Sequence, residues 1–230
     1  MRGGPSVAGH AGAVRGATMK SPSPVAGARV GSSARPHLGA DATGRREMLR
    51  EQYHHDMRNL EARTLDLGRT VASAVYEAVD ALVRGDTTRA DSIVARDQDV
   101  NRERMEIQAR VLTVIATQQP VASDIRLLAS ILEAVAEIER IGDYAKGIAT
   151  IVLKVRGETL PPAVLYRLLE MAELARAMMR SSLDAFQERD ASSAARIIAD
   201  DEAVDALFKE VFSEVVGSGG VRVIRAGIRL

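Results

Sequence analysis

Residues 85–107, GDTTRADSIVARDQDVNRERMEI, recur in outline at residues 189–211, RDASSAARIIADDEAVDALFKEV. The two stretches align without a gap at a constant offset of 104 residues. The matched positions are Asp86 with Asp190, Ile93 with Ile197, Asp97 with Asp201, Val100 with Val204, and Asn101 with Asp205. An ungapped set of this length indicates an internal repeat of one supersecondary unit.

The sequence around the first copy has the apolar spacing of long amphipathic helices. Apolar residues recur at steps of three or four from Met57 to Leu82, which predicts one buried helix face. Arg84-Gly85-Asp86 breaks this helix, and a second is expected from Thr87 until Pro120 interrupts it. A third is expected from Ser123 to Gly157, with Asp124 in its first turn. Three helices with short connections predict an antiparallel three-helix bundle.

The second copy predicts only part of a second bundle. Pro161-Pro162 opens a fourth helix that copies the first, and the fifth copies the second. We therefore expect an all-α fold of tandem three-helix bundles in which the second bundle is incomplete. The first repeat is assigned to residues 48–156 and the second, with two helices only, to residues 157–216.

The two ends of the chain differ from this helical part. Residues 1–47 are rich in Gly, Ala, Ser and Pro and basic, which predicts disorder. They are interpreted as a flexible tail, as sequence upstream of a true start at Met48, or as a transit peptide. Residues 217–230, GSGGVRVIRAGIRL, match nothing in the first repeat. This aberrant tail is either a frameshift or truncation product, or belongs to a short variant that completes its core by dimerising.

Composition excludes several classes of protein. The chain has no cysteine, which excludes disulfides, thiolate nucleophiles and Cys-ligated metals. Lys and Arg together number 31, as do Asp and Glu, so no net charge draws the chain to nucleic acid. No apolar run approaches the roughly 20 residues of a membrane-spanning helix.

Two pairs of oxygen-bearing side chains suggest a metal site. Glu139 and Asp143 lie four residues apart, which places both carboxylates on one side of the third helix, beside its apolar residues. Asp97 and Asn101 have the same spacing on the second helix. Pairs of this kind on neighbouring helices could hold a divalent or trivalent metal. The alternative is that these acids form solvated ion pairs with neighbours such as Lys146.

Three stretches resemble the PhoU family of phosphate-uptake regulators. They are EQYHHDMRNLEARTLDLG at 51–68, QQPVASDIRLL at 118–128 and EIERIGDYAKGIA at 137–149. The layout of repeated three-helix bundles is also similar to the family, and the resemblance covers about residues 48–216.

The resemblance implies a cytoplasmic, homodimeric negative regulator of phosphate uptake and phosphate-starvation signalling, without catalysis of its own. Its expected partners are the ATPase of the phosphate ABC transporter and a phosphate-responsive sensor kinase, with membrane contact only through them. It also implies iron, zinc or manganese clusters. By the resemblance these are assigned to Glu139 and Asp143, and in second place to Asp97, Asn101, Asp201 and Asp205.

This chain departs from the family pattern in its extension at residues 1–47 and in lacking a second E-x-x-x-D motif. The offset of 104 places that motif beyond residue 230. The sequence leaves two alternative functions open. One is a ferritin-like di-metal enzyme, which needs a Glu-x-x-His motif on each of two helices, whereas this sequence contains a single one, Glu51 to His54. The other is a purely structural helical interaction module.

Overall fold

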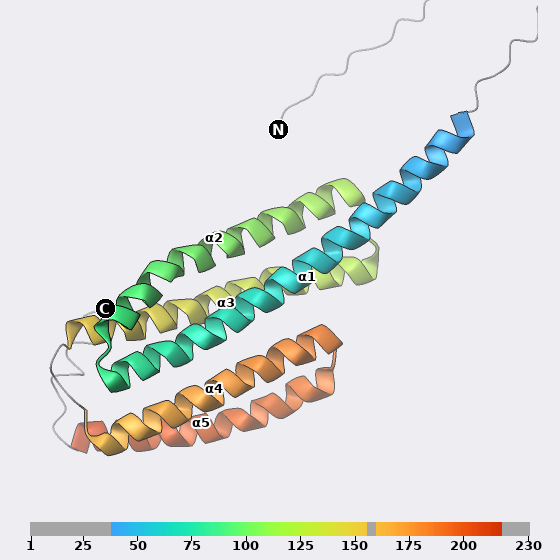
Figure 1. Cartoon of the computed structure of the whole chain (residues 1–230). Coiled ribbons are helices and arrows are strands. Elements are labelled where there is room, and N and C mark those ends of the chain that lie inside the picture. Colours follow the sequence, from blue (N-terminus) through green and yellow to red (C-terminus); the bar gives the residue numbers. More distant parts are fainter. Residues whose placement is uncertain (1–37, 156–159, 218–230) are drawn as a thin grey trace, which may run out of the picture.

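The computed structural model describes residues 38–155 and 160–217, and all five elements in these ranges are α-helices (Figure 1). They are α1 (Leu38–Arg84), α2 (Thr87–Gln118), α3 (Ala122–Lys154), α4 (Pro162–Glu188) and α5 (Ala191–Gly217). The expected all-α bundle architecture is confirmed.

Helices α1, α2 and α3 pack on one another as a three-helix bundle, and α4 lies against α1. The main core follows the predicted apolar periodicity and includes one leucine from α4. Its largest fully buried side chains are Leu60, Val71, Ile107, Val111, Val114, Leu128, Ile131 and Val135. Helix α5 packs on α4 at the outer edge of the molecule (Figure 1). Within the described residues, 38–155 and 160–217, no third helix therefore packs against both α4 and α5.

The helix boundaries follow local signals in the sequence. Gly85 has a φ of +65°, a conformation that glycine adopts without steric cost, and it ends α1. Asp86 then caps α2 by accepting a hydrogen bond from the Arg89 amide at 3.0 Å. Pro162 occupies the first turn of α4, as expected. Asp190, the repeat counterpart of Asp86, accepts from the Ser192 amide at the start of α5, at 2.9 Å.

The start of α1 differs from the sequence-based expectation. Residues 38–47 were predicted to belong to a disordered extension, yet they lie within α1. The helix projects past the bundle at this end (Figure 1), and residues 44–50 are exposed. Extending a formed helix adds one hydrogen bond per residue fixed, so it needs no tertiary packing and leaves no apolar period in the sequence. The remainder of the predicted extension, residues 1–37, lies outside the described residues, as do 156–159 and the tail from 218.

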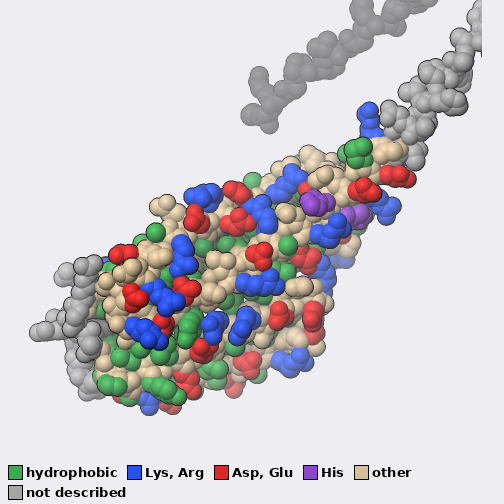
Figure 2. Space-filling view, viewed as in Figure 1, with side chains coloured by type: hydrophobic (Ala, Val, Ile, Leu, Met, Phe, Trp, Pro, Cys, Tyr) green, Lys and Arg blue, Asp and Glu red, His purple; other side chains and the backbone are tan. Residues whose placement is uncertain are grey.

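Ion pairs connect the helices of the first bundle. Arg110 of α2 donates to buried Asp56 of α1 at 2.6 Å. Arg63 of α1 donates to both carboxylate oxygens of Glu103 in α2, at 2.7 and 2.9 Å. Figure 2 shows charged side chains of both signs interspersed over the visible face. None of the described helices is apolar enough over a sufficient length to span a bilayer.

Candidate functional site

The predicted acids of the first repeat lie where α2 passes α3, at different depths. Asp97 is buried, with 7% of its surface exposed, and Asn101 beside it is half-buried. On α3, Glu139 is half-buried, as the spacing predicts. Asp143 is exposed, so the expectation that it borders the apolar face is wrong. Asp143 follows Glu139 by four residues, a net rotation of about 40° around the helix axis, which carries its side chain from the edge of the core to solvent.

Lys146 is the cation that the structure places on Asp97. Its Nζ lies 2.6 Å from Asp97 Oδ2, and the Asn101 amide donates to the same oxygen at 3.3 Å. The hydrogen bond with Asp97 raises the pKa of Lys146, and the charges of Asp97, Asp143 and Glu139 act in the same direction. Lys146 thus contacts one carboxylate of α2 and interacts through its charge with two carboxylates of α3.

Arg104 of α2 places a second cation next to these acids. Its Nε lies 3.8 Å from Glu139 Oε1, and its Nη1 donates to Gln108 at 2.9 Å. The Nε atom itself is buried and has no hydrogen-bond partner. We call the six residues Asp97, Asn101, Arg104, Glu139, Asp143 and Lys146 the α2–α3 acidic corner.

The acidic corner has oxygen atoms of the kind that bind metals, but Lys146 and Arg104 already lie against them. Carboxylate and amide oxygens suit iron, manganese and zinc. However, Lys146 and Arg104 approach the oxygens of Asp97 and Glu139 that a metal would need. Within the described ranges, no three His, Asp or Glu side chains stand close enough to hold a metal ion. Metal binding here stays a prediction, and it requires Lys146 to leave Asp97.

The acids of the second repeat lie apart from this corner. Asp201 and Asp205 are both exposed on α5. Helix α5 packs on α4, so the structure does not bring these acids to Glu139 and Asp143. Their assignment to a metal site stays a prediction.

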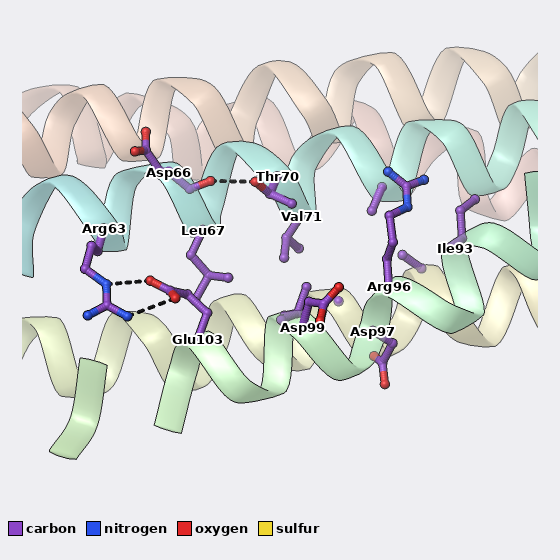
Figure 3. A pocket seen from close by; sticks show the side chains of 14 residues that line it. Arg63, Asp66, Leu67, Thr70, Val71, Ile93, Arg96, Asp97, Asp99 and Glu103 are labelled. Carbon is purple, nitrogen blue, oxygen red and sulfur yellow. Dashed lines mark hydrogen bonds and ion pairs between the residues drawn. The ribbon is translucent and has the colours of Figure 1, made fainter. Parts of the chain in front are cut away.

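A cavity of about 400 Å³ lies between α1 and α2, next to the acidic corner (Figure 3). Its apolar lining includes Leu67, Val71, Ile93 and Val100, and Ala145 of α3. Gly142 also lines it. A Cβ atom at this position would lie 3.4 Å from a methyl group of Val100, which is an ordinary van der Waals contact. Gly142 is buried and faces the core of the bundle.

Charged groups close the rim of this cavity. In Figure 3 Arg63 reaches from α1 to Glu103 of α2, while the Asp97 carboxylate points away from α1. Arg96 is held by Glu77 of α1 at 2.8 Å. The hydrogen bond from Arg63 lowers the pKa of Glu103. The rim cations are thus neutralised within the bundle.

Comparison with known proteins assigns this arrangement to a family. The model of the PhoU domain matches residues 64–152 and again residues 168–218, which is the pattern of two repeats. The chain belongs to the PhoU family. A relative from Clostridium acetobutylicum, the phosphate-specific transport system accessory protein PhoU homolog, is 31% identical over 170 residues. These residues are 74% of this chain and 77% of that protein.

Solved PhoU structures share the fold. The crystal structure of PhoU from Pseudomonas aeruginosa matches with a TM-score of 0.69 and 28% identity, over 76% of this chain and 85% of that one. The phosphate transport system regulatory protein PhoU from Streptococcus pneumoniae matches with a TM-score of 0.65 and 29% identity. That alignment covers 72% of this chain and 77% of the other.

Sequence reasoning found the acids and named Lys146 as a possible ion-pair partner, but it missed Arg104. Lys146 follows Asp143 by three residues and Glu139 by seven, so the helical period already places it on the same side of α3. The spacing does not show, however, that Lys146 contacts Asp97 of α2. Arg104 gave no comparable signal, because its contact with Glu139 depends on how α2 and α3 pack.

Proposed function

We propose that this chain is an accessory regulator of phosphate transport, which restrains phosphate uptake and phosphate-starvation signalling in the cytoplasm. The observation that supports this most directly is the shared scaffold. Both helical repeats match the PhoU domain, and the relatives with that scaffold are named as accessory and regulatory proteins of the phosphate transport system.

The structure is suited to a role through contact between proteins. The first bundle is cross-linked by Arg110 with Asp56, Arg63 with Glu103 and Lys146 with Asp97. These links hold three helices in a defined register, while exposed side chains remain on the outer faces of α2 and α3. A rigid body with long exposed helix faces can bind partners without large rearrangement. We propose that the partners are the phosphate transporter ATPase and a phosphate-responsive sensor kinase, and that regulation proceeds by binding rather than catalysis.

The test is complementation in a phosphate-replete bacterium that lacks its own PhoU. The chain should restore repression of a phosphate-starvation reporter, and a tagged copy should co-purify with the transporter ATPase and the sensor kinase. The proposal is wrong if the chain is expressed and folds normally but neither restores repression nor co-purifies with those two proteins.

We further propose that iron, zinc or manganese binds at the acidic corner through Glu139, Asp143, Asp97 and Asn101. Metal would supply the positive charge that Lys146 and Arg104 now provide there. The double variant Glu139→Gln/Asp143→Asn should then lose metal in elemental analysis of the purified protein. Glu137→Gln is a matched control, because Glu137 is exposed on α3 and pairs with Arg140. Equal metal contents in the two variants would exclude the site.

A further inference from the structure

The cavity between α1 and α2 has the size and lining of a small-molecule site. Its volume of about 400 Å³ lies within the range of about 300–1,000 Å³ in which proteins bind small molecules. Its apolar floor is formed by residues of three helices, which are Leu67, Val71, Ile93, Val100 and Ala145. An apolar floor under a charged rim suits a molecule with a hydrocarbon body and one polar end.

The internal repeat shows that the cavity depends on small side chains of α1. At the offset of 104, two of its lining positions in α1 have much larger apolar counterparts in α4, and a third has a smaller counterpart. The pairs are Thr70 with Leu174, Ala74 with Met178 and, in the smaller direction, Val71 with Ala175. A threonine and an alanine leave space that a leucine and a methionine would fill. The first repeat therefore keeps a space where its copy carries hydrocarbon.

The two arginines on the rim of the cavity are engaged by carboxylates of the bundle. Arg63 donates three hydrogen bonds to Glu103 and Glu106, at 2.7 to 2.9 Å. Arg96 donates to Glu77 at 2.8 Å. An anionic ligand would have to compete with these carboxylates for both arginines. The rim therefore disfavours an anion.

Hydrogen-bond acceptors are available on both sides of the mouth. Asp99 of α2 is exposed and lies between the two rim arginines in Figure 3. Its Oδ1 accepts from Arg102 at 3.0 Å, in an exposed pair of the weak kind, and a carboxylate has room for further donors. Thr70 of α1 donates its hydroxyl hydrogen to the Asp66 carbonyl oxygen and keeps its own oxygen as an acceptor. The mouth therefore favours a ligand that brings N–H donors and positive charge.

We propose that this cavity binds a small organic cation, with an alkyl or aromatic body against Val71 and Val100 and a primary ammonium group at the mouth. The ammonium group donates to the Asp99 carboxylate and to the Thr70 hydroxyl oxygen. The site is separate from the acidic corner, because the Asp97 carboxylate points away from α1 in Figure 3. Binding of a small molecule here goes beyond regulation through contact between proteins.

Three probes that share one hydrocarbon body test the class of ligand. They are phenethylamine, phenethyl alcohol and hydrocinnamate, titrated into the full chain and followed through the methyl NMR signals of Val71 and Val100. Phenethylamine should shift these signals with a dissociation constant of about 1 mM or lower. It should bind about tenfold or more tightly than hydrocinnamate, with phenethyl alcohol between them. No shift with phenethylamine, or equal affinity for the amine and the carboxylate, overturns the proposal.

Ala74→Met tests whether the probe enters the cavity. Methionine is the residue at the matching position of the second repeat, Met178, so it suits this place on the helix. Its longer side chain should fill the cavity and weaken phenethylamine binding about tenfold or more. Ala109→Met is the matched control and should bind like the wild type, because Ala109 is exposed on α2 outside the cavity lining. An Ala74→Met protein that folds and binds as tightly as the wild type contradicts the proposal.

Asp99→Asn tests the charge at the mouth and does not depend on how Ala74→Met folds. Removing this carboxylate should weaken phenethylamine binding about threefold to tenfold and leave the affinity for phenethyl alcohol unchanged. Asp91→Asn is the control, because Asp91 is an exposed acid of the same helix that does not line the cavity. Equal affinities of Asp99→Asn and Asp91→Asn for phenethylamine would show that the proposal is wrong.

Discussion

At the scale of single residues, Lys146 determines the state of the acidic corner. It bonds Asp97 directly, and two further carboxylates raise its pKa. Asp97 is nearly inaccessible, whereas the Lys146 side chain is 42% exposed. The lysine can therefore move away from the site more easily than the aspartate can. A bound cation would replace the Lys146 amine and leave Asp97 in place.

Replacing Lys146 with methionine should destabilise the metal-free chain by about 1–3 kcal/mol, because it leaves the Asp97 carboxylate buried without its amine. The loss should be present at neutral pH. It should shrink only above the usual lysine pKa of about 10.4, because a raised pKa keeps Lys146 charged in the folded state. Urea denaturation at several pH values measures this. Arg140→Met is the control and should cost little, since Arg140 forms an exposed pair with Glu137.

Glu103 should make stability depend on acid pH. Its pKa is lowered, so its contribution is present above the unfolded value of about 4.3 and is lost as the pH falls through the folded value. Glu103→Gln should reduce the unfolding free energy at pH 7 by about 0.2–1 kcal/mol, the range of partly exposed ion pairs. The difference should vanish at the lowest pH at which the fold persists. A difference that is constant with pH would show that the Arg63 contact contributes nothing through charge.

At the scale of helices, two buried glycines lie where neighbouring helices pack together, and only one of them is required there. A Cβ atom on Gly68 of α1 would lie 2.5 Å from Leu183 Cδ2 of α4, which is a steric clash. At Gly142 of α3 the nearest atom would be 3.4 Å away, an ordinary contact. The seam between α1 and α4 therefore needs its glycine, and the approach of α3 to α2 does not.

Gly68→Ala and Gly142→Ala should therefore have opposite effects on stability. The first should destabilise by about 1–3 kcal/mol through overpacking against Leu183. The second should stabilise by about 0.5–1 kcal/mol, because alanine is the better residue within a helix. Thermal and urea denaturation compare the two. In Gly68→Ala/Leu183→Ala the removed methyl groups relieve the clash, so the two single costs should not add; additive costs would exclude a clash as the cause.

At the scale of the whole molecule, packing is unequal between the two repeats. Helices α1, α2 and α3 share a common core, while none of the described α5 side chains is buried. Helix α5 depends on α4, and α4 in turn depends on α1. Stability should therefore decrease outward from the first bundle.

Amide hydrogen exchange should reveal this gradient. In dilute solution the amides of α5 should exchange fastest among the packed helices, because few buried contacts oppose their opening. Exchange in α5 as slow as in α3 at high dilution would contradict the gradient.

Local signals in the sequence determined the helices. Gly85, Asp86 and Pro162 each act within one turn, and the apolar period of the first bundle identifies the side chains that become buried. These effects depend on backbone conformation and on neighbours three or four residues away, so they can be read without a tertiary structure. The internal repeat likewise identified helices four and five as copies of one and two.

Only the tertiary structure decided the surroundings of the predicted site. The sequence placed Glu139 and Asp143 on one helix side, but the packing of α2 on α3 buried Asp97, left Asp143 in solvent and brought Lys146 and Arg104 to the acids. It also left Phe208 and Phe212 uncovered on α5. Contacts between residues about 50 positions apart depend on the rotation and distance of whole helices. Those quantities follow from how all side chains pack together, which no local period encodes.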